Sequence, residues 1–151
     1  MKLFELAQRF IGEIREIPGE AHHPFIQWAH MLCNLGESQP DEVPWCSSFI
    51  NACCWLLRLP RSKSAAARSW LSIGQAIELH NAMIGDVVIL KRGSGDGAQG
   101  PEVLNAPGHV GLFAGADIIR GTVNVLGGNQ SDGVTVASFK SANVIGVRRL
   151  A

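Results

Sequence analysis

The sequence predicts an α+β domain in which N-terminal helices pack on a C-terminal antiparallel sheet. The first half of the chain repeats apolar residues at helical spacing, whereas the second half holds β-rich runs between turns of glycine, asparagine and aspartate. Apolar residues make up 46% of the 151 residues and charged residues 17%, as in compact globular folds. No repeat or linker divides the chain, so we expect a single domain over residues 1–151.

Four helices are expected in the first half. The first covers about residues 2–15 and has an apolar face, and the second starts at Pro24 and closes near Gly36. The third runs from about Trp45 to Pro60, because apolar residues there recur every three or four positions. A short fourth helix spans 65–71 and stops before Gly74.

Five strands are expected in the second half because β-branched and aromatic residues cluster between turn residues. They are Asp86–Leu90, Val110–Ala114, Asn124–Leu126, Val134–Ala137 and Val144–Arg148. The glycine-rich stretch between the first two lacks the spacing of a phosphate-binding loop, so we interpret it as a surface loop.

Cys46 stands in the first turn of the third predicted helix, directly after Pro44 and Trp45. A thiol at a helix N-terminus lies near the positive end of the helix dipole, which favours the thiolate that attacks carbonyl groups. The alternative is a small apolar core residue, which is what free cysteines usually are. The helix pattern alone does not separate these two interpretations.

Two later segments place polar residues at the ends of predicted strands. His109 opens a strand between Gly108 and Gly111, and Asn129 begins the polar turn after the next strand. A cysteine on a helix start, a histidine and a carboxamide can act as nucleophile, base and orienting residue. A single histidine is more often structural, so the prediction depends on all three occurring together.

These segments resemble the NlpC/CHAP superfamily of papain-like cysteine peptidases and amidases, which cut bacterial peptidoglycan. The matching pieces are Trp45–Phe49, Ile84–Leu90, Gly108–Phe113 and Gly127–Gln130. Two further pieces, Ile17–Glu20 and Ser64–Leu71, are similar to a subgroup common in phage and prophage lysis proteins. Together the pieces cover most of the chain, and the cysteine, strand and histidine blocks stand in the family's order.

The resemblance implies a papain-like fold with one catalytic domain over the whole chain and a Cys-His-Asn triad. Cys46 would be the nucleophile, His109 the general base and then acid, and Asn129 the third member. Relatives vary at the third position, so Gln130 and Asp132 remain alternatives for it.

Trp45 has two interpretations, a residue of the substrate groove that contacts the stem peptide or a core tryptophan. The segment from Arg92 to Pro107 is longer than the resemblance leads us to expect, which leaves one wall of the groove undefined.

The implied activity is that of a phage endolysin-like peptidoglycan hydrolase. It would cut an amide bond of the stem peptide or its junction with the glycan through a thioester acyl-enzyme. Two alternatives stay open: an interbacterial peptidoglycan amidase effector with the same triad, and a non-catalytic wall-binding or virion module with this fold. The partner in each case is bacterial peptidoglycan, and we expect a monomer.

Composition argues against several other functions. The formal net charge is zero, with 13 basic and 13 acidic residues, which does not fit a nucleic-acid-binding protein. Apolar runs are short, so no membrane insertion is expected. The charged N-terminus has no signal-peptide core, so we expect the protein to stay in the host bacterial cytoplasm until release lets it reach the wall.

No cofactor or metal is expected. The four cysteines lack zinc-ligand spacing, and we expect all of them to be reduced. His22, His23 and His30 fit solvated positions better than a metal site. Asp41 and Glu42 stand where some CHAP relatives bind calcium, but one acidic pair does not supply the six or more oxygen ligands that calcium takes.

Overall fold

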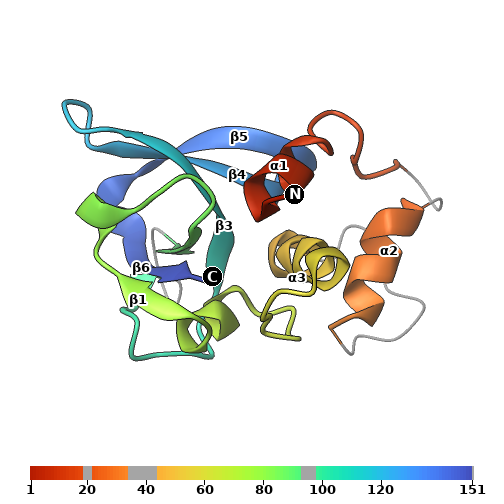
Figure 1. Cartoon of the computed structure of the whole chain (residues 1–151), viewed down its shortest axis with the longest axis horizontal. Coiled ribbons are helices and arrows are strands. Elements are labelled where there is room, and N and C mark those ends of the chain that lie inside the picture. Colours follow the sequence, from red (N-terminus) through yellow and green to blue (C-terminus); the bar gives the residue numbers. More distant parts are fainter. Residues whose placement is uncertain (19–21, 34–43, 93–97, 151) are drawn as a thin grey trace.

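The computed structural model describes residues 1–18, 22–33, 44–92 and 98–150. Within these ranges, α-helices from the first part of the chain lie on one side of a six-stranded antiparallel sheet built from the second part (Figure 1). The predicted α+β class is confirmed in this general form. None of the helices in these ranges is long and apolar enough to cross a membrane.

The helices are α1 (Leu3–Gln8), α2 (Pro24–Met31) and α3 (Cys46–Leu57). The prediction for α1 was too long, because the chain turns at Gly12, whose φ is +78°, and Arg15 then bridges Gly133 of the sheet. Pairing with the sheet therefore ends the helix earlier than the apolar spacing of the sequence predicts. The predicted end of α2 near Gly36 lies outside the described residues.

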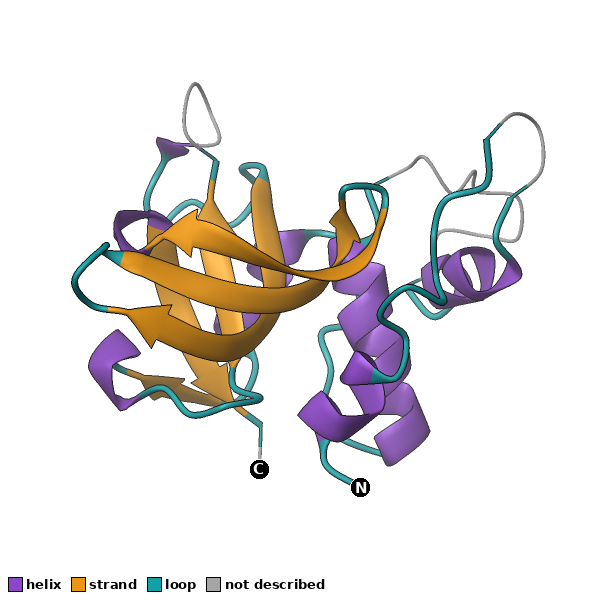
Figure 2. Ribbon diagram, turned by 90° about the horizontal axis from the view of Figure 1, so that it is seen from above, coloured by secondary structure: helices purple, strands orange, loops and turns teal. Residues whose placement is uncertain are grey.

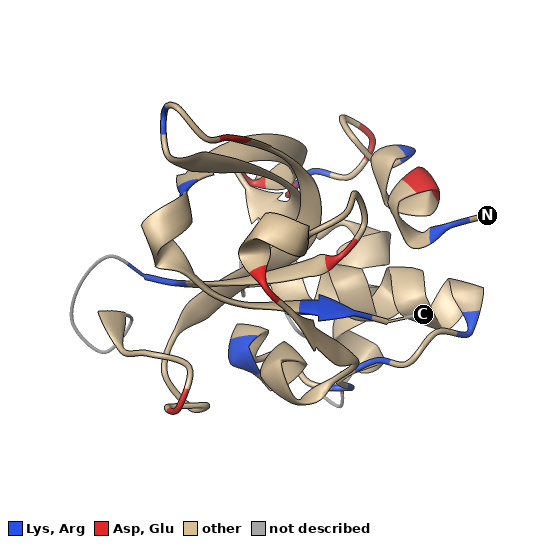
Figure 3. Cartoon of the chain, turned by 60° about the vertical axis from the view of Figure 1, so that its left-hand side comes forward, with Lys and Arg blue, Asp and Glu red and all other residues tan. Residues whose placement is uncertain are grey.

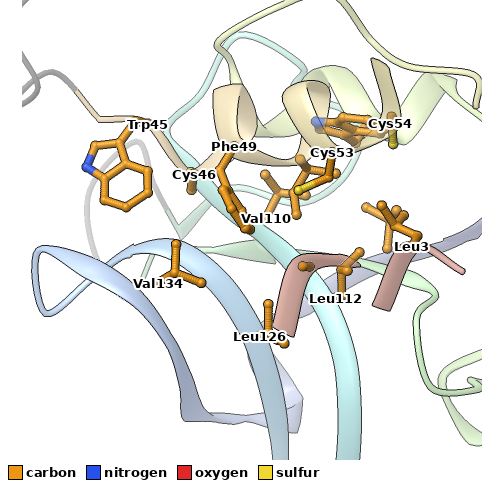
Figure 4. Packing of buried hydrophobic residues seen from close by; sticks show 14 of the residues in the cluster. Leu3, Trp45, Cys46, Phe49, Cys53, Cys54, Val110, Leu112, Leu126 and Val134 are labelled. Atoms are coloured by element: carbon orange, nitrogen blue, oxygen red, sulfur yellow. The ribbon is translucent and has the colours of Figure 1, made fainter. Parts of the chain in front are cut away.

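Helix α3 is the central element of the helical layer, and its prediction is confirmed. Every residue from Cys46 to Cys54 is buried, because one side of α3 packs on the sheet and the others on α1, α2 and the segment after it (Figure 4). The helix ends where Arg58 adopts a left-handed conformation and the Leu59 N–H donates to the Cys54 carbonyl at 2.9 Å. The fourth predicted helix is a 3₁₀ helix, η1 (Ala67–Ser72).

The sheet has the strand order β1-β6-β2-β3-β4-β5, and each neighbouring pair is antiparallel. The strands are β1 (Gln75–Ile77), β2 (Val87–Lys91), β3 (Gly108–Asp117), β4 (Thr122–Gln130), β5 (Gly133–Lys140) and β6 (Val144–Arg149). All five predicted strands are present, and most are longer than predicted. The short edge strand β1 was not predicted, because three residues carry no readable alternation.

The sheet is strongly curved, so each of its faces covers a separate core (Figure 2). Cys46, Phe49, Val110, Leu112 and Leu126 belong to the core between the sheet and the helices. The opposite face holds a smaller core, which consists of Val88, Leu90, Phe113, Val123 and Val125. Alternate residues of β3 therefore point to different cores.

The pairing of strands becomes irregular at one end of β3 and β4. The register of β3 with β4 runs from Asp117 to Leu112, so Val110 lies beyond the paired residues. The register of β4 with β5 shifts between Gly127 and Gln130, and Asn129 there has a φ of +59°. The first turn of α3 packs against this end of the sheet.

Candidate active site

Cys46 is the first residue of α3 and points from the helix toward β3 (Figure 4). Its side chain belongs to the helix-side core, and 3% of the residue is exposed. The backbone N–H groups of Val110, Ser47 and Cys46 itself lie near the sulfur and favour its thiolate form. The sulfur therefore lies where β3 extends beyond its pairing with β4.

Gly128 allows the start of α3 to come this close to β4. A Cβ atom at this position would lie 2.5 Å from the Trp45 ring and 2.9 Å from the Phe49 Cβ atom. Only a residue without a side chain avoids both contacts. Gly128 therefore has a packing role next to Cys46.

Burial determines the protonation of the Cys46 thiol. It raises the pKa above the ordinary value of 9.0, and it outweighs the nearby N–H groups and the charge of Arg92, which lower the pKa. At neutral pH the thiol therefore keeps its proton. The helix start alone does not produce the thiolate that its position in the sequence suggested.

His109 is the second residue of β3 and is 4% exposed. It pairs with Leu90 of β2, and its ring packs on Phe139 with 5.2 Å between ring centroids, so the side chain lies on the face away from α3. Burial lowers the pKa of the imidazole from 6.5 to about 4, although the hydrogen bond with Gln130 opposes this shift. His109 is therefore neutral at physiological pH.

Gln130 fixes the tautomer of His109. The His109 Nε2 atom lies 2.9 Å from Gln130 Oε1. The amide nitrogen of Gln130 donates to the carbonyl oxygens of Val125 at 3.2 Å and Thr135 at 2.8 Å, so its oxygen must face the ring. An amide oxygen only accepts, so His109 carries its proton on Nε2, and Nδ1 is the nitrogen that can accept one.

The structure brings Cys46, His109 and Gln130 to the same end of β3 and β4. His109 and Val110 are consecutive residues, and the thiol lies against the Val110 N–H group. Among the described residues no hydrogen bond joins the sulfur to the imidazole. The two groups approach this end of the sheet from its two faces.

Among the described residues the His109 ring has a hydrogen bond with Gln130 and none with Asn129, although Asn129 was the first choice for the third position. Its left-handed backbone conformation turns the chain, so that Gln130 and not Asn129 faces His109. Asparagine tolerates this conformation better than most residues. Asp132 is exposed and also has a positive φ of 60°, and among the described residues it has no hydrogen bond with the ring either.

Trp45 lies in the core, with 1% of the residue exposed. Its indole N–H donates to Glu16 Oε1 at 2.8 Å, and its ring packs edge-on against Phe49. This matches the core interpretation of Trp45, because no face of the ring is open to a stem peptide.

Arg68 was not identified from the sequence. It binds the segment that leads into β3 and His109. It is fully buried, and its guanidinium donates to the carbonyl oxygens of Gln99, Gly100, Val103 and Pro107 at 2.7–3.0 Å. It thereby fixes the described part of the 92–107 segment immediately before β3. A buried arginine has no hydrophobic periodicity that would reveal it from sequence.

The described residues hold no cluster of three His, Cys, Asp or Glu side chains that could bind a metal ion. His23 accepts from the Phe25 N–H and so caps α2. His30 was expected to be solvated, but it is fully buried and hydrogen-bonds Ser48. Asp41 and Glu42 lie outside the described residues. The four cysteines are free and buried.

Comparison of the sequence with known proteins does not assign it to a family. No protein-family model matches the chain, and no curated protein is significantly similar to it.

Proposed function

We propose that this protein is a papain-like cysteine peptidase or amidase that hydrolyses an amide bond of bacterial peptidoglycan. The observation that supports this most is the position of Cys46. It begins a buried helix and lies against the start of β3, where Gln130 holds His109 in a single tautomer. The amide would lie in the stem peptide or at its junction with the glycan.

The proposed reaction starts from a neutral thiol and a neutral imidazole. Within the described part of the chain the two groups share no hydrogen bond at rest, so the proposed reaction requires them to meet at this end of the sheet when substrate binds. As the Cys46 sulfur attacks the substrate carbonyl carbon, His109 Nδ1 then takes the thiol proton. The backbone N–H of Cys46 stabilises the oxyanion of the tetrahedral intermediate. His109 then gives its proton to the amine nitrogen, the C–N bond breaks, and a thioester remains on Cys46.

Water completes the cycle. His109 Nδ1 removes a proton from the attacking water, the C–S bond breaks, and the proton returns to the sulfur. Gln130 accepts from the imidazole Nε2–H throughout, so it stabilises the transient imidazolium and keeps the ring in place. The chain supplies both reactive groups, so the reaction requires no cofactor.

The biological setting of the proposal is a phage endolysin-like lysis protein. It would act as a monomer on the wall after release from the host cytoplasm. The same chemistry would serve an interbacterial amidase effector.

A second candidate is a non-catalytic wall-binding or virion module with this fold. The deep burial of Cys46 and His109, at 3% and 4% exposure, favours it, because both reactive groups are covered in the resting structure. Such a module would release no fragments from peptidoglycan.

Mass spectrometry of fragments released from purified peptidoglycan tests the proposal. We expect fragments with a new amine and a new carboxylate, and the carboxylate should gain one heavy oxygen atom when the digest is run in ¹⁸O-water. Fragments with only new reducing sugar ends would show a glycosidase and contradict the proposal. The absence of any fragments would favour the non-catalytic module.

A further inference from the structure

A cavity of about 530 Å³ opens at the far end of α3 from Cys46. It is lined by Trp55, Leu56, Arg58, Leu59 and Arg61. A helix rises about 1.5 Å per residue, so the twelve residues of α3 separate Cys46 from this cavity by most of the helix length. The cavity, here named the α3-end cavity, is therefore distinct from the candidate active site.

The apolar wall of the α3-end cavity is exposed. Trp55 and Leu56, in the last turn of α3, are 49% and 44% exposed, and Met31 of α2 is also exposed. The Trp55 ring meets Trp28 of α2 edge-on, with 5.5 Å between ring centroids, which fixes the indole in place. A half-exposed indole in the wall of a cavity offers a stacking surface to a flat, partly apolar ligand.

Arg58 lines the α3-end cavity in a strained conformation. It occupies the left-handed position that ends α3, with a φ of 57°, and the Leu59 N–H donates back to the Cys54 carbonyl. Glycine is the usual residue at this position because any side chain there raises the energy of the backbone. A positively charged side chain is retained at this cost, and such strain is concentrated at functional sites.

The two charged residues that line the α3-end cavity, Arg58 and Arg61, are both basic. From residue 43 to 77 the sequence contains Arg58, Arg61, Lys63 and Arg68 but no Asp or Glu, although the whole protein is neutral. In the rest of the chain both acidic and basic residues occur (Figure 3). Arg61 donates to the Leu32 carbonyl at 2.9 Å, which holds its guanidinium at the cavity wall. Among the described residues neither Arg58 nor Arg61 pairs with a carboxylate.

We propose that the α3-end cavity binds an anionic saccharide, with a sugar ring stacked on Trp55 and a carboxylate held by Arg58 and Arg61. Guanidinium groups recognise carboxylates through paired hydrogen bonds, and the apolar face of a sugar covers an indole. If the proposed function is correct, the ligand is the carboxylate-bearing glycan of the wall. The cavity then anchors the enzyme at a distance from the bond that it cuts.

Co-sedimentation with purified peptidoglycan tests this site, in a Cys46→Ala background that removes hydrolysis. The informative variant is Arg58→Gly, because glycine relieves the left-handed strain while removing the charge. We expect about tenfold weaker binding, the loss of one charged contact, together with an unchanged or higher melting temperature. Trp55→Ala should weaken binding as well. The matched control is Arg120→Gly, which removes an 82% exposed arginine from a distant turn.

Equal binding by Arg58→Gly and Arg120→Gly would overturn the proposal, as would a lower melting temperature of Arg58→Gly, which would assign Arg58 a structural role. Preferential binding to phosphatidylglycerol vesicles, lost in Arg58→Gly, would replace the saccharide with a lipid surface. The site and the proposed function fail independently. A parent protein that binds peptidoglycan through Arg58 without cutting it keeps the site, whereas cutting without Arg58-dependent binding keeps only the activity.

Discussion

The proton on His109 sits on Nε2 because Gln130 presents its amide oxygen there, and the low pKa keeps Nδ1 unprotonated at neutral pH. Burial acts on Cys46 in the opposite direction and keeps its thiol protonated. Both residues are therefore neutral at rest. In the proposed reaction the proton moves only when the sulfur attacks, so the imidazole would act as a general base.

The pKa of His109 predicts a pH dependence of stability. The folded imidazole titrates at about 4 and the unfolded one at about 6.5, so between these values the unfolded chain binds more protons. The free energy of unfolding should therefore fall as the pH drops from 6.5 to 4, by on the order of 3 kcal/mol from this residue. Urea titrations at several pH values measure this, with His109→Gln as the control that lacks this contribution. An NMR titration with the folded His109 ring at pKa 6.5 would refute the prediction.

Gln130 is predicted to matter more than Asn129 for turnover. Gln130→Ala removes the acceptor that orients the ring, so we expect turnover to fall by at least about tenfold. The reaction of Cys46 with iodoacetamide, which is slow in the parent because the thiol is buried and protonated, should keep the parent rate. Asn129→Ala should have a smaller effect, because the hydrogen bond to the ring comes from Gln130.

Gln130→Glu is the matched control, since it keeps an acceptor toward Nε2 and should raise the pKa of His109, moving the acid limb of the pH–rate profile upward. A severe loss in Asn129→Ala with normal turnover in Gln130→Ala would return the orienting role to Asn129.

At the scale of elements, the site depends on the contact between the first turn of α3 and the end of β4. Gly128→Ala would place a Cβ atom 2.5 Å from the Trp45 ring, so the helix start would have to move. We expect a loss of about 2 kcal/mol in the free energy of unfolding, typical of overpacking a core.

Thermal unfolding measures this loss, and Gly146→Ala in β6 is the control. A Cβ atom there would meet the ends of two flexible side chains, Leu71 at 2.5 Å and Arg148 at 3.2 Å, rather than a ring and a Cβ atom of α3. Equal losses in both variants would show that the approach of α3 to Gly128 is not specially tight.

Elements with strong periodicity could be predicted from the sequence. The apolar spacing after Trp45 predicted α3, and β-branched runs predicted β2 to β6. The short β1 and the early end of α1 depend on pairing with distant segments, such as the bridge from Arg15 to Gly133, which local patterns do not contain.

The candidate site shows the same division. Cys46 and His109 stand out because of their residue types and their positions at the ends of elements. The sequence favoured Asn129 as the partner of His109, whereas the structure places Gln130 there. The difference arises because Asn129 has a left-handed backbone conformation, which shifts the alternation of side chains along β4. Arg68 could not be predicted, because it binds backbone carbonyl groups. Every residue has such a group, so the sequence of the loop does not reveal the contact.

At the scale of the whole molecule, the proposed nucleophile Cys46 belongs to the helical layer and the proposed base His109 to the sheet. Activity should survive EDTA, because the proposed reaction draws both groups from the chain and routes no step through an ion. The measurement is the rate of peptidoglycan solubilisation before and after chelation. Loss of activity that calcium or zinc restores would contradict this and direct attention to Asp41 and Glu42.

The central claim is that Cys46 forms a thioester with a peptidoglycan amide carbonyl. Its most direct test is the rate of amine release from purified peptidoglycan by the parent, Cys46→Ala and Cys53→Ala proteins, each shown to be folded by circular dichroism. Cys53 lies on the same helix and is fully buried, so its variant should lose stability but retain the rate per folded molecule. We predict no release above background from Cys46→Ala. Release by Cys46→Ala at the parent rate would contradict the account.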